Sequence, residues 1–541
     1  MTGARALLEM LGAAGVDRLF GNPGTTELPL LDELVAFEQI AYHLVLQESV
    51  AVGMADGYAQ ASGRPAVLSL HATGGVANAL GLVYNASRAG TPLVLLCGQQ
   101  DTRLALQEPF LHSEMVRWVR PLVKWAHEVV HPADLGRALR RALSDAFAPP
   151  TGPVFLALPL DVLRAEAAAE DIAPRVAPQV APDLADVERA AGLLRSARAP
   201  LVVAGDRVAH AGAETDLRAL ADATGWPVAL EPYPTRFIFP TRHPQARGAL
   251  PRFAAGVRAA LAPHDAVLVC GMTPFEHFLY DGVLPIPPDT RVVHFDLAAS
   301  FIGRNHPVAA GVAGDLRASL AALRESLGPG RCVDARDRGA AGTHRAPEDP
   351  PAGAYEAVAD AVAAVLVPDD VLVEEAISAR AAVLARVPRT VPGTFFGQKG
   401  GTIGWGLPAA LGVKLAHPGR RVVAIVGDGS ALMAAQGLWT AARYAIAVVW
   451  LVLNNRGYTI LKQGLAGLDG PAARTGVYPG TDVAGVDLVG LSRSLGVAAE
   501  RVAVSGGERA RSLEEALGRA FEAPGPVLLD VAVDVPVRPL S

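Results

Sequence analysis

The chain has 541 residues, of which 51% are hydrophobic and 19% charged, so it encodes a globular protein of several domains rather than a disordered one. Its 48 basic and 54 acidic residues give a net charge of −6, which disfavours a nucleic-acid partner. The apolar runs are too short to cross a bilayer, and the N-terminal segment lacks the pattern of a secretory signal. Three widely spaced cysteines, Cys97, Cys270 and Cys332, are typical of buried thiols in a reducing compartment. We therefore predict a cytoplasmic protein without a membrane partner.

Short apolar runs alternate with alanine-rich helical stretches along the chain, the pattern of βαβ units and parallel sheets. An amphipathic helix is predicted at the N-terminus. Buried strands are predicted at residues 18–21, 65–71, 92–97, 201–204, 266–270, 291–295, 371–373, 422–426 and 447–453. Two segments rich in proline and charge, residues 166–185 and 329–351, are predicted to be linkers. They divide the chain into three α/β domains, at residues 1–165, 186–328 and 352–541.

Two predicted strands of the third domain both end on polar side chains. The run VVAIV ends at Gly427, Asp428 and Gly429, and Ser430 is the expected N-cap of a helix over residues 431–444. The next strand ends at residues 454–455, a pair of asparagines. Parallel neighbours finish at the same edge of a sheet, so we expect these side chains to lie together. Their oxygens suit Mg²⁺, and the helix N-terminus suits a diphosphate.

Other interpretations of these residues are open on local grounds. Glycine and aspartate favour turns, so GDGS alone is compatible with a simple strand-to-helix connection. A dinucleotide site requires a third glycine and an acid at the next strand end, and asparagines stand there instead, which disfavours NAD. Similarly, Glu48 lies between an apolar run and an apolar helix. It is either a helix-start acid bonded to backbone N–H groups or a buried functional carboxyl.

The GDGS stretch, with paired asparagines at this distance, resembles the thiamine diphosphate signature of the decarboxylase and acetolactate synthase superfamily. The stretches FGNPGTTELPLL, LQESVAVGMADGYAQASG, SLHATGGVANALG and PLVKW also look like the first domain of that superfamily, most of all that of benzoylformate decarboxylases. The resemblance implies pyrimidine-binding, central and diphosphate-binding α/β domains with parallel sheets. It also implies thiamine diphosphate and Mg²⁺ as cofactors.

The resemblance assigns roles to individual residues. Glu48 is expected to activate the cofactor through its pyrimidine ring, His71 and His277 to handle substrate and protons, and Thr25 to bind the substrate carboxylate. The expected Mg²⁺ ligands are Asp428, Asn455 and the carbonyl of Gly457. Gly401 is expected to present its carbonyl to the cofactor, and Ile403 to support the bent cofactor from below. Further cofactor contacts are expected from Asn22, Pro23, Gly24, Asn78, Ser378, Gly429, Ser430 and Tyr458.

The sequence departs from the benzoylformate decarboxylase pattern near the expected substrate. Thr25 stands where serine is usual, and Ile377 and Ile460 replace smaller residues. Added methylene groups narrow a packed pocket, so a smaller or aliphatic 2-oxo acid is a candidate substrate beside a benzoylformate-like one.

We therefore predict a thiamine diphosphate- and Mg²⁺-dependent lyase that decarboxylates a 2-oxo acid to an aldehyde. One alternative is an acetolactate-synthase-like carboligase that forms a hydroxyketone. Another is a non-catalytic nucleotide-binding or regulatory subunit, against which the joint presence of Glu48, His71, Asp428 and Asn455 argues. The family also implies a homodimer or homotetramer with active sites between subunits.

Overall fold

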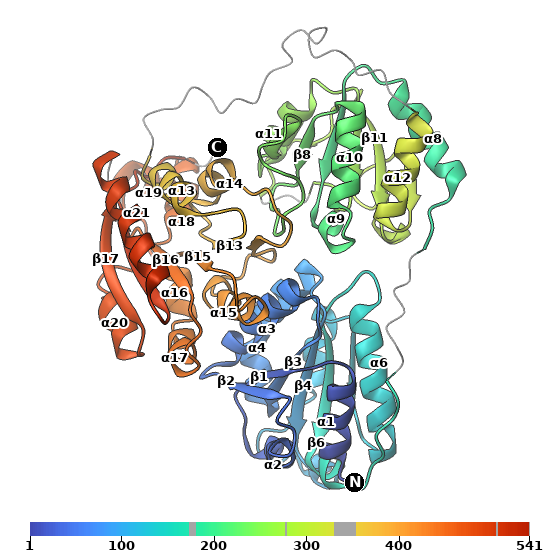
Figure 1. Cartoon of the computed structure of the whole chain (residues 1–541), viewed down its shortest axis with the longest axis vertical. Coiled ribbons are helices and arrows are strands. Elements are labelled where there is room, and N and C mark those ends of the chain that lie inside the picture. The colour runs from blue at the N-terminus through green and yellow to red at the C-terminus, as the bar shows by residue number, and fades with distance from the viewer. Residues whose placement is uncertain (173–179, 276–278, 329–352, 505–506, 540–541) are drawn as a thin grey trace. The chain divides into compact units, whose positions relative to one another are not determined.

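The computed structural model describes residues 1–172, 180–275, 279–328, 353–504 and 507–539, and it contains three six-stranded parallel sheets with helices packed against them (Figure 1). This confirms the predicted α/β architecture. The N-terminal and C-terminal sheets belong to one compact unit, formed by Met1–Ala177, Asp369–Arg380 and Phe396–Leu540. The central sheet belongs to a second unit, formed by Pro178–Pro368 and Ala381–Phe395.

The N-terminal sheet has the strand order β2-β1-β3-β4-β6-β5. Its strands are β1 (Arg18–Gly21), β2 (Ala41–Leu44), β3 (Ala66–His71), β4 (Leu93–Gln99), β5 (Trp125–Glu128) and β6 (Val154–Pro159). Its helices are α1 (Gly3–Ala13), α2 (Leu28–Leu34), α3 (Glu48–Ser62), α4 (Ala72–Ala89), α5 (Met115–Val119), α6 (Leu135–Phe147) and α7 (Leu160–Arg164). The strand β4 is apolar and buried along its whole length, as expected for a parallel strand covered on both faces. Gly21 of β1 pairs with Ser69 of β3, so the turn after β1 and His71 lie at the same edge.

The central sheet has the order β12-β11-β10-β7-β8-β9. Its strands are β7 (Pro200–Ala204), β8 (Val228–Leu230), β9 (Ala246–Ala249), β10 (Ala266–Cys270), β11 (Arg291–Asp296) and β12 (Ala310–Ala313). Its helices are α8 (Leu184–Arg195), α9 (Asp206–His210), α10 (Glu214–Thr224), α11 (Ala254–Leu261) and α12 (Leu316–Leu327). At its carboxyl edge, Arg207 donates to both oxygens of Asp296 at 2.8 and 2.6 Å and lies over the Phe301 ring. An internal ion pair therefore connects two strand ends of this sheet.

The C-terminal sheet has the order β14-β13-β15-β16-β18-β17. Its strands are β13 (Val371–Glu375), β14 (Phe395–Gly397), β15 (Val422–Gly427), β16 (Val449–Asn454), β17 (Ala498–Val504) and β18 (Val527–Val533). The helices of this half of the chain are α13 (Ala354–Val365), α14 (Arg380–Arg386), α15 (Gly406–Ala416), α16 (Asp428–Met433), α17 (Gln436–Arg443), α18 (Thr459–Gly467), α19 (Pro471–Thr475), α20 (Leu488–Ser494) and α21 (Gly507–Glu522). Gly427 of β15 pairs with Leu453 of β16, so Asp428 and the paired asparagines emerge at one edge, as predicted.

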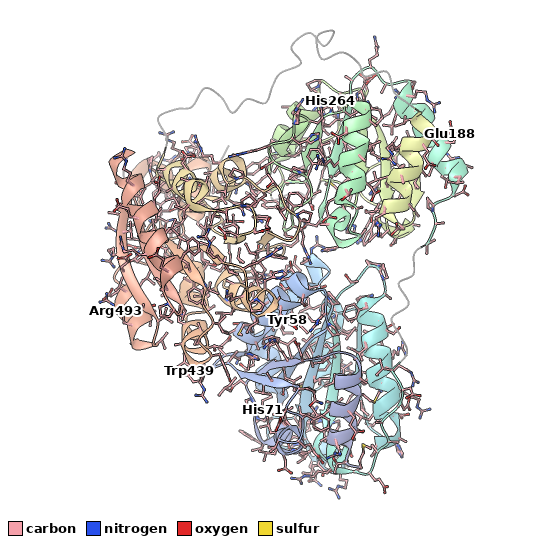
Figure 2. The ribbon with its side chains drawn as sticks, viewed as in Figure 1. Tyr58, His71, Glu188, His264, Trp439 and Arg493 are labelled. Atoms are coloured by element: carbon pink, nitrogen blue, oxygen red, sulfur yellow. The ribbon has the colours of Figure 1, made fainter. Side chains whose placement is uncertain are left out.

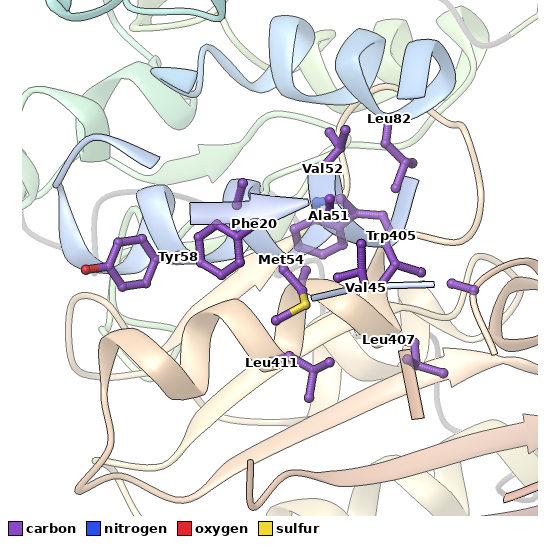
Figure 3. Close-up of a cluster of buried hydrophobic side chains, with 14 of the residues drawn as sticks. Phe20, Val45, Ala51, Val52, Met54, Tyr58, Leu82, Trp405, Leu407 and Leu411 are labelled. Atoms are coloured by element: carbon purple, nitrogen blue, oxygen red, sulfur yellow. The ribbon is translucent and has the colours of Figure 1, made fainter. Parts of the chain in front are cut away.

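Helices α3 and α15 pack backbone against backbone between the N-terminal and C-terminal sheets. A methyl group on Gly412 would lie 1.9 Å from the carbonyl oxygen of Met54, so only glycine permits this approach. Buried side chains from both sheets continue the contact, with Met54 close to Trp405 (Figure 3). The Trp405 indole donates a hydrogen bond to Asp56 of α3 at 2.5 Å. The two sheets thus share one core.

Some predictions differ from the structure or lie outside it. The helix expected over residues 431–444 is two helices, α16 and α17, interrupted at Ala434 and Ala435. Cys97 and Cys270 are buried free thiols, as predicted. Cys332, the linker at 329–351 and residues 173–179 of the other linker lie outside the described residues. Within the described ranges, none of the helices is both long and apolar enough to cross a membrane.

Candidate functional site

Glu48 is the first residue of α3, but it does not cap the helix. The side chain of Gln47 does so, because its Oε1 accepts hydrogen bonds from the backbone N–H groups of Ser49 at 2.7 Å and Val50 at 3.3 Å. The Glu48 carboxylate is 6% exposed and accepts a hydrogen bond from Asn78 of α4 at 2.9 Å. Glu48 is thus an acid at the start of a helix, as one interpretation expected, but Gln47 rather than Glu48 accepts the backbone N–H groups there.

His71 is the last residue of β3 (Figure 2), and a buried carboxylate contacts its ring. Its Nδ1 lies 2.9 Å from Oε2 of Glu27 and 3.1 Å from the hydroxyl of Thr26. Glu27 is 2% exposed, and it also accepts the backbone N–H of Gly24 at 2.8 Å and the Thr26 hydroxyl at 2.7 Å. Nδ1–H therefore points at Glu27 in the neutral ring, and Nε2 has no hydrogen-bond partner within the described residues.

The turn that follows β1 fits closely against the His71 ring. A methyl group on Gly24 would lie 2.3 Å from that imidazole, so the backbone and the ring are in contact only because residue 24 is glycine. Asn22 and Pro23 are partly buried in the same turn, whereas Thr25 is exposed at the start of a short 3₁₀ helix. The structure thus places Thr25 at the surface of this turn, and its neighbour Thr26 makes the contact with His71.

The predicted metal ligands converge after β15 and β16. Oδ2 of Asp428 and Oδ1 of Asn455 both accept the backbone N–H of Gly457 at 3.1 Å, so the two oxygens lie side by side. The other oxygen of Asp428 accepts the N–H of Gly429 at 2.8 Å. Burial raises the pKa of Asp428, although the hydrogen bonds from Gly429 and Gly457 oppose that shift. The site is a buried carboxylate with an amide oxygen beside it.

Ser430 has a different place from the one predicted. The N-cap position of α16 is Gly427, and the helix already begins at Asp428. The Ser430 hydroxyl oxygen instead accepts the backbone N–H of Gly404 at 3.0 Å. The Tyr458 ring packs against Gly429, because a methyl group on that glycine would lie 2.4 Å from a ring carbon. The Tyr458 side chain therefore lies against the start of the helix.

The segment before α15, residues 400–405, carries two of the predicted cofactor contacts. Gly401 has a φ of +89°, a conformation that favours glycine, and Ile403 is partly buried. Asn85 of α4 fixes the residue between them, because its side chain donates to the Thr402 carbonyl at 2.7 Å and accepts its N–H at 3.2 Å. This loop is therefore anchored to the N-terminal sheet.

Three family descriptions match the chain in order. They are the thiamine pyrophosphate enzyme N-terminal TPP binding domain at residues 1–115, the central domain at 187–323 and the C-terminal TPP binding domain at 378–531. The chain is 35% identical over 537 residues to a benzoylformate decarboxylase of Pseudomonas aeruginosa, which covers 97% of this chain and 98% of that protein. The chain belongs to the thiamine pyrophosphate enzyme family.

Other relatives of this thiamine pyrophosphate enzyme have different named activities. The large subunit of acetolactate synthase isozyme 3 from Escherichia coli is 28% identical, over 86% of this chain and 84% of its own. The solved structure of a thiamine diphosphate-dependent 4-hydroxybenzoylformate decarboxylase from Rhodococcus jostii superimposes with a TM-score of 0.89 at 31% identity, covering 99% of this chain and 100% of that one. Decarboxylases and synthases therefore both occur among the members of this family.

The structure of this thiamine pyrophosphate enzyme adds residues that the sequence did not indicate. Glu27 lies in the NPGTTE stretch, but no role for this residue was predicted from the sequence. A glutamate three residues after the glycine of a turn is the pattern that would have indicated it. Of the two predicted pocket residues, Ile377 follows β13 and Ile460 lies in the first turn of α18, both partly buried. Ser378, which follows Ile377, is also partly buried, whereas His277 lies outside the described residues.

Proposed function

We propose that the chain decarboxylates a 2-oxo acid without oxidation, converting R–CO–COO⁻ and a proton into R–CHO and CO₂. Thiamine diphosphate supplies an electron-accepting ring that takes up the electron pair left when CO₂ departs. The remaining requirements fall on the protein, which must hold that cofactor, orient the substrate and move one proton to the carbon that loses CO₂.

The oxygens of Asp428, Asn455 and Gly457 fit a Mg²⁺ ion that carries the diphosphate. Carboxylate, amide and carbonyl oxygens are the ligands this ion prefers, and it usually keeps few protein ligands because phosphate oxygens and water complete its shell. A cation beside Asp428 would also offset the burial that raises the pKa of this carboxyl. Glu48 would face the pyrimidine ring, since its carboxylate is buried and, within the described ranges, Asn78 is its one hydrogen-bond partner.

The observation that carries the decarboxylase proposal is the pairing of His71 with Glu27 at 2.9 Å. An aldehyde forms only after the carbon that lost CO₂ receives a proton, whereas a carboligase joins the same carbon to a second carbonyl compound. An imidazole held through Nδ1 by a carboxylate, with Nε2 unpaired among the described residues, is a suitable proton carrier. We assign that proton transfer to His71, with Thr25 orienting the carboxylate of the substrate.

The substrate we propose is a small or aliphatic 2-oxo acid. Ile377 follows β13 and Ile460 follows β16, so both come after carboxyl ends of strands in the C-terminal sheet. In the proposed pocket these larger side chains would narrow the space for the substrate. Each extra methylene group changes substrate preference by roughly 10- to 200-fold. A benzoylformate-like acid is the competing choice, and the named activity of the Pseudomonas aeruginosa relative favours it.

The test is a panel of 2-oxo acids, from pyruvate to benzoylformate, supplied to the chain reconstituted with thiamine diphosphate and MgCl₂. In D₂O we expect equal amounts of CO₂ and of aldehyde that carries deuterium on its carbonyl carbon. The His71→Ala variant should lower the rate of aldehyde formation by about 100-fold or more, because general acid catalysis contributes that much. His131→Ala is the matched control, since His131 is exposed on the surface.

The carboligase alternative has its own outcome in the same assay. With excess acceptor aldehyde or pyruvate present, a carboligase produces a hydroxyketone, and no deuterium enters the carbon that lost CO₂. If hydroxyketone formation outpaces aldehyde release under these conditions, the decarboxylase proposal is wrong and the chain is a carboligase.

A further inference from the structure

A second buried glutamate, Glu375, lies outside the site described above. It ends β13, is 2% exposed and accepts the backbone N–H of Trp405 at 3.0 Å through Oε1 and that of Gly406 at 2.6 Å through Oε2. The hydroxyl of Ser430 donates a further hydrogen bond to it. Burial raises the pKa of Glu375 to about 7, with the Ser430, Gly406 and Trp405 donors opposing and the charge of Glu374 adding to the rise.

These hydrogen bonds connect two segments that are far apart in the sequence. Ser430 donates to Glu375 and accepts the N–H of Gly404 at 3.0 Å, so three consecutive N–H groups, at residues 404–406, are bound by one carboxylate and one hydroxyl. Gly401 and Ile403, on the same loop, are candidate contacts for the pyrimidine and the bend of the cofactor. Ser430 is a candidate contact for its diphosphate.

Packing leaves the loop little freedom to satisfy these groups in another way. A methyl group on Gly406 would lie 2.7 Å from Cβ of Glu375, and one on Gly404 would lie 2.9 Å from Cβ of Met433. Gly404 also has a φ of +99°, which favours glycine. On the other side, the indole of Trp405 is bonded to Asp56 of α3. The Glu375 carboxylate therefore meets both backbone donors from a strand end that packs directly against them.

We propose that Glu375 is a positioning residue that joins the loop at residues 401–406 to the start of α16, so that both halves of the cofactor meet one rigid surface. This rests on the proposed placement of thiamine diphosphate at these residues. Glutamine cannot replace the carboxylate, because its amide accepts from one of the two backbone N–H groups and directs its own N–H₂ at the other. The loop should then move away from Ser430 while the diphosphate contacts remain.

The experiment compares two probes by calorimetry in the presence of MgCl₂, using the full chain. Inorganic diphosphate reports on the α16 side alone, and thiamine diphosphate reports on both sides. We expect Glu375→Gln to weaken thiamine diphosphate binding by about 10- to 100-fold, because a buried donor loses its partner. The affinity for inorganic diphosphate should fall by no more than about twofold. Glu375→Asp, which retains both acceptor oxygens, should fall between wild type and Glu375→Gln.

The matched control is Asp370→Asn. Asp370 is a buried carboxylate just before β13, at the opposite end of the same strand, where it pairs with Arg421. The Asp370→Asn variant should have lower thermal stability, but the ratio of its affinities for thiamine diphosphate and inorganic diphosphate should not change. A Glu375 variant that behaves in the same way, or that leaves both affinities at their wild-type values, would overturn the proposal; if Glu375→Gln does not fold, Glu375→Asp decides. A wild-type chain that binds thiamine diphosphate but releases no aldehyde would overturn the proposed reaction and leave this result standing.

Discussion

Glu27 and His71 form the most clearly organised polar group in the N-terminal half of the site. Glu27 is buried, and its oxygens are shared among the His71 ring, the Thr26 hydroxyl and the Gly24 backbone. A buried carboxylate that orients an imidazole fixes which ring nitrogen is free, and this selects the nitrogen that exchanges protons with substrate. In the proposed reaction Glu27 would therefore act through His71 rather than on the substrate.

We predict that Glu27→Gln lowers kcat by about 10- to 100-fold while thiamine diphosphate affinity stays unchanged. The substitution disturbs the orientation of the His71 ring but leaves the cofactor site intact. The measurement is steady-state kinetics beside calorimetry. Glu38→Gln, an exposed glutamate in the same half of the chain, is the control. Because the two residues act as one unit, the double variant with His71→Ala should be no slower than His71→Ala alone. Additive losses would contradict the assignment.

The sequence predicted some of these residues and missed others for identifiable reasons. Asp428 and Asn455 follow apolar strands, so strand periodicity alone brings them to one edge. Glu48 was predicted as a buried carboxyl, but the Gln47 cap that frees it was not, because glutamine is an uncommon N-cap. The Ser430 hydroxyl accepts a hydrogen bond from Gly404, which lies 26 residues earlier in the chain, and no local sequence pattern predicts that contact.

At the scale of elements, the contact of α3 with α15 depends on glycines in their shared surface. Gly57 approaches the carbonyl oxygen of Ala409 and Gly412 that of Met54, each closer than any side chain permits. Helix α3 begins at Glu48, and α15 follows the segment at residues 400–405. This packing therefore sets the distance between Glu48 and that segment, two parts of the candidate site. The apolar runs predicted nine strands that the structure contains, and the structure adds nine more within the described ranges, among them β2, β6 and β18. The runs do not show which helices meet.

We expect Gly412→Ala to destabilise the folded chain by about 1–3 kcal/mol, because the methyl group would lie 1.9 Å from the Met54 carbonyl oxygen and the helices must separate. A lower urea midpoint for the loss of near-UV circular dichroism would show it. Gly419→Ala is the control, since Gly419 is exposed and a methyl group there meets nothing within 4 Å. An unchanged midpoint for Gly412→Ala would mean that the two helices are not in close backbone contact.

At the scale of the whole molecule, the two halves of the candidate site are separately organised within one chain. Among the described residues, no hydrogen bond or ion pair links Glu48 or His71 to the group around Asp428. Large apolar side chains are exposed in the segments that follow β4, β15 and β16. They are Leu106 and Phe110 after β4, Met433 in α16, Leu461 in α18 and Leu468 directly after that helix. Exposed apolar patches of this kind mark interaction surfaces, and a second copy of the chain is the partner we propose.

If a second copy completes the site, specific activity must fall when the protein is diluted below the dissociation constant of the dimer. We predict this fall together with a halving of the mass in sedimentation, and excess thiamine diphosphate should shift both to lower concentration because it binds the assembled form. Leu106→Asp should raise the concentration needed for full activity, since Leu106 is 97% exposed in the segment after β4 that the second copy is proposed to cover. Val35→Asp, at a comparably exposed position, should not. Full specific activity in a fraction that sediments as a monomer would show that one chain carries a complete site.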